Sequence, residues 1–111
     1  MEEHLKETSD LIIRDFEIES VEKEEMTEEE LFAILADQIA YMLEYRIEFL
    51  FSLMYRLDVY ESKINAALHP SAPESANVGL ARLVLERQKQ RIKTKNEYRP
   101  SQDDRLKDME F

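Results

Sequence analysis

The chain runs from Leu31 to Leu68 without a glycine or a proline, and this uninterrupted stretch limits the folds open to it. Thr27 and Glu30 precede it as a T-x-x-E capping box, in which each side chain accepts a hydrogen bond from the other residue's backbone N–H. His69-Pro70 ends the stretch, because the residue before a proline avoids the helical region. The pattern predicts one long helix over residues 27–68.

A second helix is expected over residues 75–98, after a short connection at 69–74. Ser75 is a suitable N-cap for it. One glycine and three prolines are too few turn residues for an all-β fold. Helices joined by a short loop pack antiparallel, so the expected fold is all-α, a long antiparallel helical hairpin over residues 27–98. Residues 1–26 form an acidic arm and residues 99–111 a polar tail, both expected to be extended or partly disordered.

A wide apolar face along the first helix predicts self-association. At 1.5 Å per residue the first helix is about 63 Å long and the second about 36 Å, so the second covers only about Tyr45 to Leu68. The rest would expose a larger apolar patch than monomers usually show. We therefore expect a homodimer in which two hairpins form a four-helix bundle, with a higher oligomer or an obligate partner as alternatives. The expected oligomer interface comprises Leu31, Phe32, Leu35, Ile39, Met42 and Phe49.

The acidic arm offers another cover for the same face, since its apolar residues between Leu11 and Val21 could lie along the uncovered half-helix. Of the net charge of -10, much lies here: residues 1–30 hold 13 acids against three bases. Residues 75–98 hold six bases against two acids. This asymmetry favours electrostatic pairing within the chain or with a basic protein partner.

Polar residues on the apolar faces predict a buried network. Arg46 lies near the middle of the first apolar face and Gln88 near the middle of the second, while Glu61 and Asp58 lie at the edge of the first. In an antiparallel hairpin Arg46 falls level with Glu97. Buried charges must be paired, so these five residues are expected to form a structural network that fixes helix register and oligomeric state.

Two other readings of Arg46 stay open. It could hold an anionic head group in a pocket of the dimer core beside Met42 and Phe49, which would make the protein a small-molecule or lipid-like ligand binder. It could also extend its guanidinium to the surface.

Catalytic, metal and cofactor motifs are missing from the sequence. Without cysteine there is no disulfide, thiolate zinc site or cysteine nucleophile. His4 and His69 have no E-x-x-H partner, and Glu44 and Glu48 fall on the polar face. A single glycine allows no glycine-rich phosphate loop. We expect no catalytic, metal-binding or cofactor-binding residue, and hence no enzyme.

The acidic N-terminus has no secretory signal pattern, and the apolar runs fall far short of the roughly 20 residues of a membrane span. We expect a cytoplasmic protein without a membrane partner. The basic run 87–95 leaves weak nucleic-acid binding through the second helix as an alternative. Its charges spread around the helix with little aromatic interleaving for base stacking, so we do not favour that alternative.

Two strings resemble a group of short bacterial helical proteins of unassigned function. They are Met54-Tyr55-Arg56-Leu57-Asp58-Val59 with Glu61, Lys63 and Ile64, and Leu83-Val84-Leu85-Glu86-Arg87-Gln88-Lys89-Gln90 with Ile92 and Lys93. The likeness covers roughly residues 35–95 and implies that the R-x-D and E-R-Q elements face each other across the hairpin. The function expected from the sequence is that of a non-enzymatic interaction or scaffold protein acting as a homo-oligomer.

Overall fold

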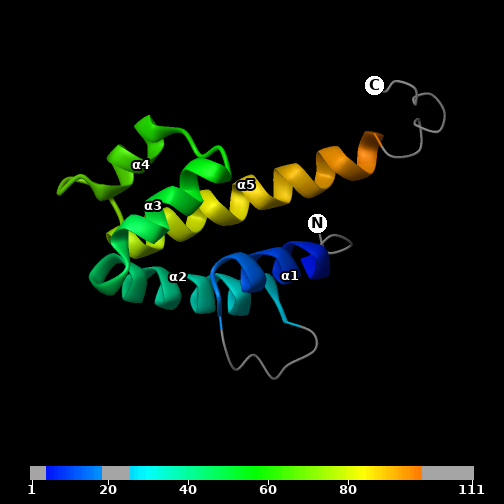
Figure 1. Cartoon of the computed structure of the whole chain (residues 1–111), viewed down its shortest axis with the longest axis horizontal. Coiled ribbons are helices and arrows are strands. Elements are labelled where there is room, and N and C mark those ends of the chain that lie inside the picture. The colour runs from blue at the N-terminus through cyan, green and yellow to red at the C-terminus, as the bar shows by residue number, and fades with distance from the viewer. Residues whose placement is uncertain (1–4, 19–25, 99–111) are drawn as a thin grey trace.

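The computed structural model describes residues 5–18 and 26–98, which form five helices with no strand among them (Figure 1). In chain order these are α1 (Leu5–Asp15), α2 (Glu28–Tyr45), α3 (Ile47–Arg56), α4 (Glu61–Leu68) and α5 (Ala76–Tyr98). The expected all-α class is confirmed. Residues 1–4 and 19–25 of the expected arm, His4 among them, and the expected tail 99–111 lie outside the described residues.

The predicted capping box starts α2. The Glu30 N–H donates to Thr27 Oγ1 at 3.1 Å, and the Thr27 N–H donates to Glu30 Oε1 at 2.9 Å. Glu28, Glu29 and Glu30 occupy the first turn, where the helix dipole favours negative charge. The start of the predicted first helix is therefore confirmed.

The prediction of one continuous helix over 27–68 is wrong, and the first break is at Arg46. Its backbone (φ −143°, ψ 50°) leaves the helical region, although its N–H still donates to the Met42 carbonyl at 2.8 Å. The guanidinium bonds Glu17 Oε1 at 2.7 Å and lies 4.2 Å from the centre of the Phe49 ring. We attribute the break to these contacts, because the local sequence holds no glycine or proline to cause it.

The second break is a Schellman motif at the end of α3. The Val59 N–H donates to the Met54 carbonyl at 3.1 Å, and the Asp58 N–H donates to the Tyr55 carbonyl at 3.0 Å. The motif needs a left-handed residue, usually glycine, and Asp58 takes this place with φ 64°. Aspartate tolerates the left-handed region better than most residues. Val59 and Met54 are both buried, as the apolar contact of this motif requires.

The end of α1 repeats the motif with a glutamate. The Ile18 N–H donates to the Ile13 carbonyl at 3.0 Å, and Glu17 is left-handed with φ 54°. At both helix ends the left-handed acid pairs with an arginine from a distant segment: Glu17 with Arg46 at 2.7 Å, and Asp58 with Arg87 at 3.7 Å. The carboxylates thus link each turn to the rest of the fold.

The central element is α5, which contacts α1, α2 and α4. It runs antiparallel to α2, because Lys89 pairs with Glu28 at 2.8 Å while Asn77 Nδ2 donates to the Ala36 carbonyl at 3.1 Å. The end of α3 is tied to it by Arg87, whose Nε donates to the Leu57 carbonyl at 2.9 Å.

The two ends of α5 meet different elements. Its C-terminal half lies along α1, where Asn96 bonds Glu7 and Gln88 approaches Asp15. Near its start, Gly79 allows a close approach of α4, since a Cβ at this position would lie 3.2 Å from that of Ala67.

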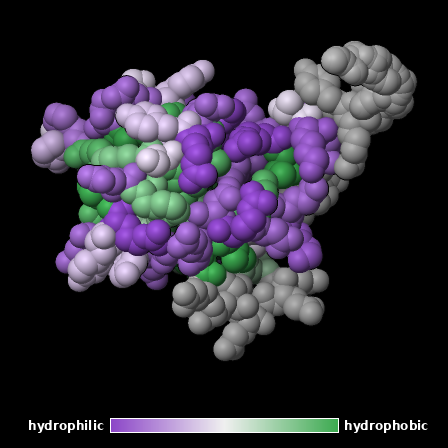
Figure 2. All heavy atoms as spheres, in the orientation of Figure 1, coloured by the Kyte–Doolittle hydropathy of each residue, from purple (hydrophilic) through white to green (hydrophobic). Residues whose placement is uncertain are grey.

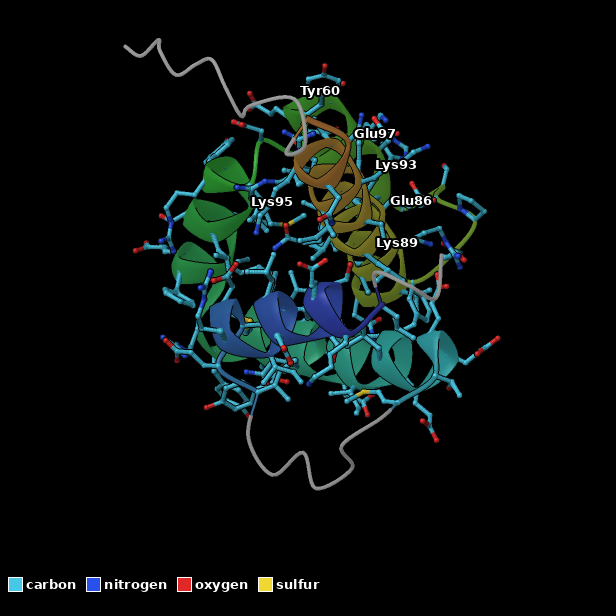
Figure 3. The ribbon with its side chains drawn as sticks, turned by 90° about the vertical axis from the view of Figure 1, so that its right-hand side faces the viewer. Tyr60, Glu86, Lys89, Lys93, Lys95 and Glu97 are labelled. Atoms are coloured by element: carbon cyan, nitrogen blue, oxygen red, sulfur yellow. The ribbon has the colours of Figure 1, made fainter. Side chains whose placement is uncertain are left out.

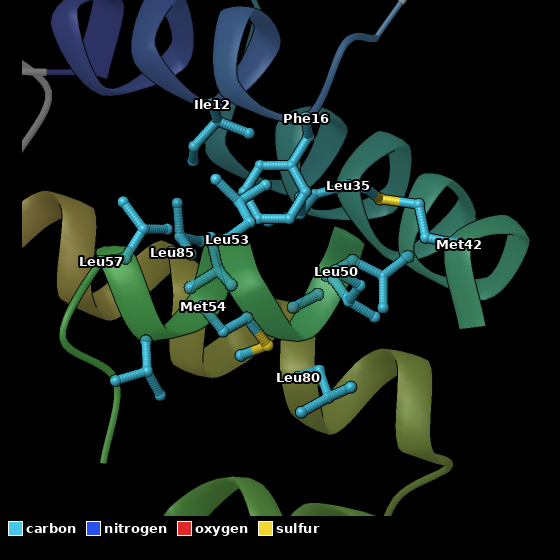
Figure 4. Close-up of a cluster of buried hydrophobic side chains, with 14 of the residues drawn as sticks. Ile12, Phe16, Leu35, Met42, Leu50, Leu53, Met54, Leu57, Leu80 and Leu85 are labelled. Atoms are coloured by element: carbon cyan, nitrogen blue, oxygen red, sulfur yellow. The ribbon is translucent and has the colours of Figure 1, made fainter. Parts of the chain in front are cut away.

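The breaks let one chain close its own core (Figure 4). Ile12 of α1, Phe16 just after α1, Leu50 and Met54 of α3 and Leu80 of α5 are fully buried in one cluster with the apolar face of α2. The expectation that a single chain leaves that face exposed is therefore wrong. The chain does not run straight through 27–68, so α3 and α5 reach the same core as α2. The arm, which was the alternative cover expected for this face, packs on it as α1, and the expectation of an extended arm is wrong for Leu5–Asp15.

Candidate functional site

The expected oligomer interface lies inside the chain. Leu31, Leu35, Ile39 and Met42 have no exposed surface. The other two are half-buried and carry cations: Arg82 stands 5.0 Å from the centre of the Phe32 ring, and Arg46 covers Phe49. These six side chains are thus already used in intrachain packing, and a surface for a partner must be sought elsewhere.

The five residues of the expected polar network do not come together within the chain. Only Gln88 is buried; its Nε2 lies 3.4 Å from Asp15 Oδ2, and its Oε1 has no hydrogen-bond partner among the described residues. Asp58, Glu61 and Glu97 are exposed. Arg46 meets Glu17 from the end of α1 and not Glu97, because the break at Arg46 and the packing of α1 change the expected register.

The expected ligand pocket around Arg46 is also not formed in the single chain. Met42 is in the core, and the Arg46 guanidinium lies over Phe49 at the edge of a groove that neither Met42 nor Phe49 lines. Arg46 is partly exposed, as the reading with its guanidinium at the surface expected, and its charge is paired with Glu17.

Most of the large hydrophobic side chains that the described chain leaves exposed are tyrosines, with Ile47 and Leu68 beside them. Tyr41, Tyr45, Tyr55 and Tyr60 are 50–70% exposed. Tyr41 and Tyr45 touch on α2, with ring centroids 5.1 Å apart at 44°. On the face of Figure 2, which is mainly hydrophilic, hydrophobic side chains reach the surface in separate patches rather than one continuous area. The exposed aromatic residues therefore stand among polar groups, as in the rim and anchors of protein interfaces.

The outward face of α2 combines these tyrosines with acids. Asp37, Tyr41 and Glu44 follow one another at one-turn spacing and are exposed, and the exposed Glu48 lies beyond the break, in the first turn of α3. The sequence of α2 holds five acids and no base. We call Asp37, Tyr41, Glu44, Tyr45 and Glu48 the acidic tyrosine face. None of its three carboxylates forms a salt bridge with another described residue.

A groove of about 480 Å³ borders this face between α2 and the end of α1. Asp37 and Tyr41 line it from α2, and Ile18 and Glu17 from the segment after α1. Arg46 is the cation at its edge, and that cation is already bonded to Glu17. The groove thus offers an unpaired carboxylate and an aromatic ring side by side, a combination suited to a cationic side chain.

The opposite charge gathers at the far end of α5. Arg91, Lys93 and Lys95 are exposed and form no salt bridge within the described part of the chain. Glu97 is the one acid among residues 90–97. We call Arg91 and Lys95, which lie one turn apart on the same side of the helix, the basic end of α5.

A second groove lies at the α3–α4 turn. Its volume is about 660 Å³, and its lining includes Tyr55, Tyr60, Lys63 and Arg87. Tyr60 has Lys63 Nζ at 5.8 Å from its ring centre. The groove is lined by both acids and bases and has no single dominant charge, so its composition does not specify one class of ligand.

One exposed ion pair shows a perturbed titration. Arg82 Nη2 and Nε both bond the Glu74 carboxylate, which lowers the pKa of Glu74 and raises the pKa of Arg82. This pair joins the 69–74 connection to α5 and lies away from the acidic tyrosine face, so we regard it as structural. No group of three or more acidic or histidine side chains in the described residues is arranged to hold a metal ion. None of the described helices has the length and apolar character of a bilayer span.

No protein-family model matches the chain, and no match is found among curated proteins or among solved structures.

Proposed function

We propose that this chain is a non-enzymatic interaction or scaffold protein that works as a homodimer, and that its contact surface includes the acidic tyrosine face. The observation that carries the proposal is the exposure of Tyr41 and Tyr45, in ring contact on a helix face whose carboxylates lack cationic partners in the described chain. Tyrosine is enriched at protein interfaces because its ring buries apolar area while its hydroxyl hydrogen-bonds.

The proposal keeps the homodimer expected from the sequence but changes the surface that forms it. The buried leucine face of α2 supports the single chain and is not available to a partner. A dimer therefore uses groups that the single chain leaves without partners. A four-helix bundle of two straight hairpins is no longer part of the proposal.

Light scattering at several protein concentrations tests it on the full chain. We expect a dimeric mass for the unmodified chain and a lower dimer fraction for Tyr41→Ser with Tyr45→Ser. Tyr55→Ser with Tyr60→Ser is the matched control, since it removes two equally exposed rings at the α3–α4 turn. A monomeric mass for the unmodified chain at every concentration would sink the proposal.

A second candidate is small-ligand binding, and the 660 Å³ groove at the α3–α4 turn favours it over the original Arg46 pocket. The groove offers two aromatic rings with both basic and acidic side chains at its lining, groups able to bind an aromatic compound that carries polar substituents. A ligand screen by melting temperature checks this, with Tyr60→Ser as the variant that should remove any shift.

A further inference from the structure

The acidic tyrosine face and the basic end of α5 are complementary in charge, yet they cannot meet within one chain. Since α2 and α5 are antiparallel and Lys89 lies opposite Glu28, residues 91–98 extend past the start of α2. Tyr41 and Tyr45 lie toward the other end of α2. In Figure 1 the end of α5 and the end of α2 accordingly lie at opposite ends of the molecule.

Contact between two identical acidic faces is unfavourable. Bringing Asp37, Glu44 and Glu48 of two copies together would oppose six carboxylates with no base on either α2 to separate them. Like charges placed against each other across an interface cost several kcal/mol. A dimer through this face thus needs a basic surface on the other copy.

We propose that the chain forms a two-fold symmetric, antiparallel dimer in which Arg91 and Lys95 of each copy dock on the acidic tyrosine face of the other. The inference rests on the homodimer proposed above and names its contacts. A two-fold axis repeats the contact, because complementary patches at opposite ends of one molecule face each other twice when two copies lie antiparallel.

The spacing of the groups agrees with this pairing. Arg91 and Lys95 are about one turn apart, as are Tyr41 and Glu44. One cation can enter the groove beside Asp37 and Tyr41, and the other can reach Glu44 on the next turn. Arg46 shows that this groove accommodates a guanidinium, since Arg46 lines the groove and bonds Glu17 there.

Lys93 supplies an internal control. Two residues from Lys95, it points to a different side of α5, as the labelled side chains in Figure 3 show. It therefore carries the same charge at the same helix end without belonging to the docking pair.

Charge reversal on the full chain tests the pairing. In Arg91→Glu with Lys95→Glu, the Kd of the dimer should rise by more than about 100-fold, because repulsion acts at both symmetric contacts. Lys63→Glu with Lys93→Glu has the same net charge change and should shift the Kd by less than about threefold. Asp37→Lys with Glu44→Lys should raise the Kd of the dimer in the same way, because it places positive charge opposite Arg91 and Lys95.

Mixing the two docking variants should restore a dimer of one chain of each kind, seen as a mixed mass in native mass spectrometry. In that mixed dimer the reversed end meets the reversed face, and the unmodified end meets the unmodified face. Restoration of the mixed species supports the pairing beyond any effect of net charge.

The failures are distinguishable. If the unmodified chain is monomeric throughout, the proposed function falls and this inference with it. If the unmodified chain is dimeric and Arg91→Glu with Lys95→Glu gives the same dimer Kd as its control, the homodimer stands. The proposed contact between the basic end of α5 and the acidic tyrosine face is then overturned. The unmodified chain could instead be monomeric and retard single-stranded DNA in a salt-dependent gel mobility assay, with the retardation lost in the Arg91→Glu, Lys95→Glu variant. In that case the basic end of α5 binds nucleic acid, and the inference is overturned.

Discussion

Replacing Asp58 by glycine and by alanine tests the turn that divides α3 from α4. Asp58 has φ 64°, a region that costs a residue with a Cβ about 1–2 kcal/mol and glycine nothing. In the structure the glycine variant should therefore be more stable than the alanine variant by about 1 kcal/mol. Both variants lose the contact with Arg87, so this loss cancels in the comparison.

The order of stability of the glycine and alanine variants reverses if residues 57–60 continue a helix. Alanine is then the more favourable residue by about 1 kcal/mol, because glycine is a poor helix former. The two arrangements thus differ by about 2 kcal/mol in the glycine–alanine comparison. Asp58→Val should be the least stable of the three, since a β-branched residue rarely adopts a positive φ.

Urea unfolding followed by circular dichroism measures this difference, and the melting temperatures should differ by about 4–8 °C per kcal/mol for a domain of this size. Asp37→Gly and Asp37→Ala are the control pair at a helical, exposed position, where alanine should be the more stable. An alanine variant more stable than the glycine variant at residue 58 would refute the turn.

Three further predictions concern the core and the surface. Leu35→Ala should lower the free energy of unfolding by about 2–5 kcal/mol at any protein concentration, measured by urea titration, because Leu35 is buried within one chain. Thr8→Val should raise that free energy by about 1 kcal/mol, since the buried Thr8 hydroxyl has no hydrogen-bond partner, while exposed Thr94→Val should change it little. Arg82 lowers the pKa of Glu74, so the Glu74–Arg82 pair stabilises the fold fully above the ordinary glutamate pKa, and this stabilisation is lost as pH falls through the lowered value. Glu74→Gln should therefore remove this loss at acid pH, measured as the urea midpoint of unfolding at a series of pH values.

Much of the secondary structure follows from local chemistry. Thr27 and Glu30 predicted the start of α2 because a capping box involves only neighbouring residues. His69-Pro70 and Ser75 likewise predicted the connection before α5. The all-α class followed from the helical spacing of the apolar residues.

The two breaks within 27–68 could not be found in the same way. Arg46 leaves the helix because of contacts with Glu17 and Phe49, and the first of these depends on where α1 packs. Asp58-Val59-Tyr60 did carry a signal: three residues of modest helix propensity, with an aspartate that tolerates the left-handed region. The absence of glycine concealed it, since glycine usually marks this kind of turn.

The candidate site was visible in parts. Glu44 and Glu48 were placed on the polar face, and the tyrosines could have been placed there by the same projection. What the sequence could not give was which apolar residues remain free for a partner. The arm was expected only as an alternative to a second chain, and the sequence does not choose between them; Ile12 of α1 and Phe16 just after it fill the space that a second chain was expected to occupy.

The most direct test of the account is the distance between residues 28 and 89 within one chain. The chain has no cysteine, so Glu28→Cys with Lys89→Cys places two spin labels, and dilution with unlabelled chain removes intermolecular distances. Because Lys89 Nζ lies 2.8 Å from Glu28 Oε2, we predict a short intrachain distance by pulsed electron paramagnetic resonance. A straight hairpin places residue 89 level with Met54, about 39 Å along the helix from residue 28, and a distance of that order would contradict the account.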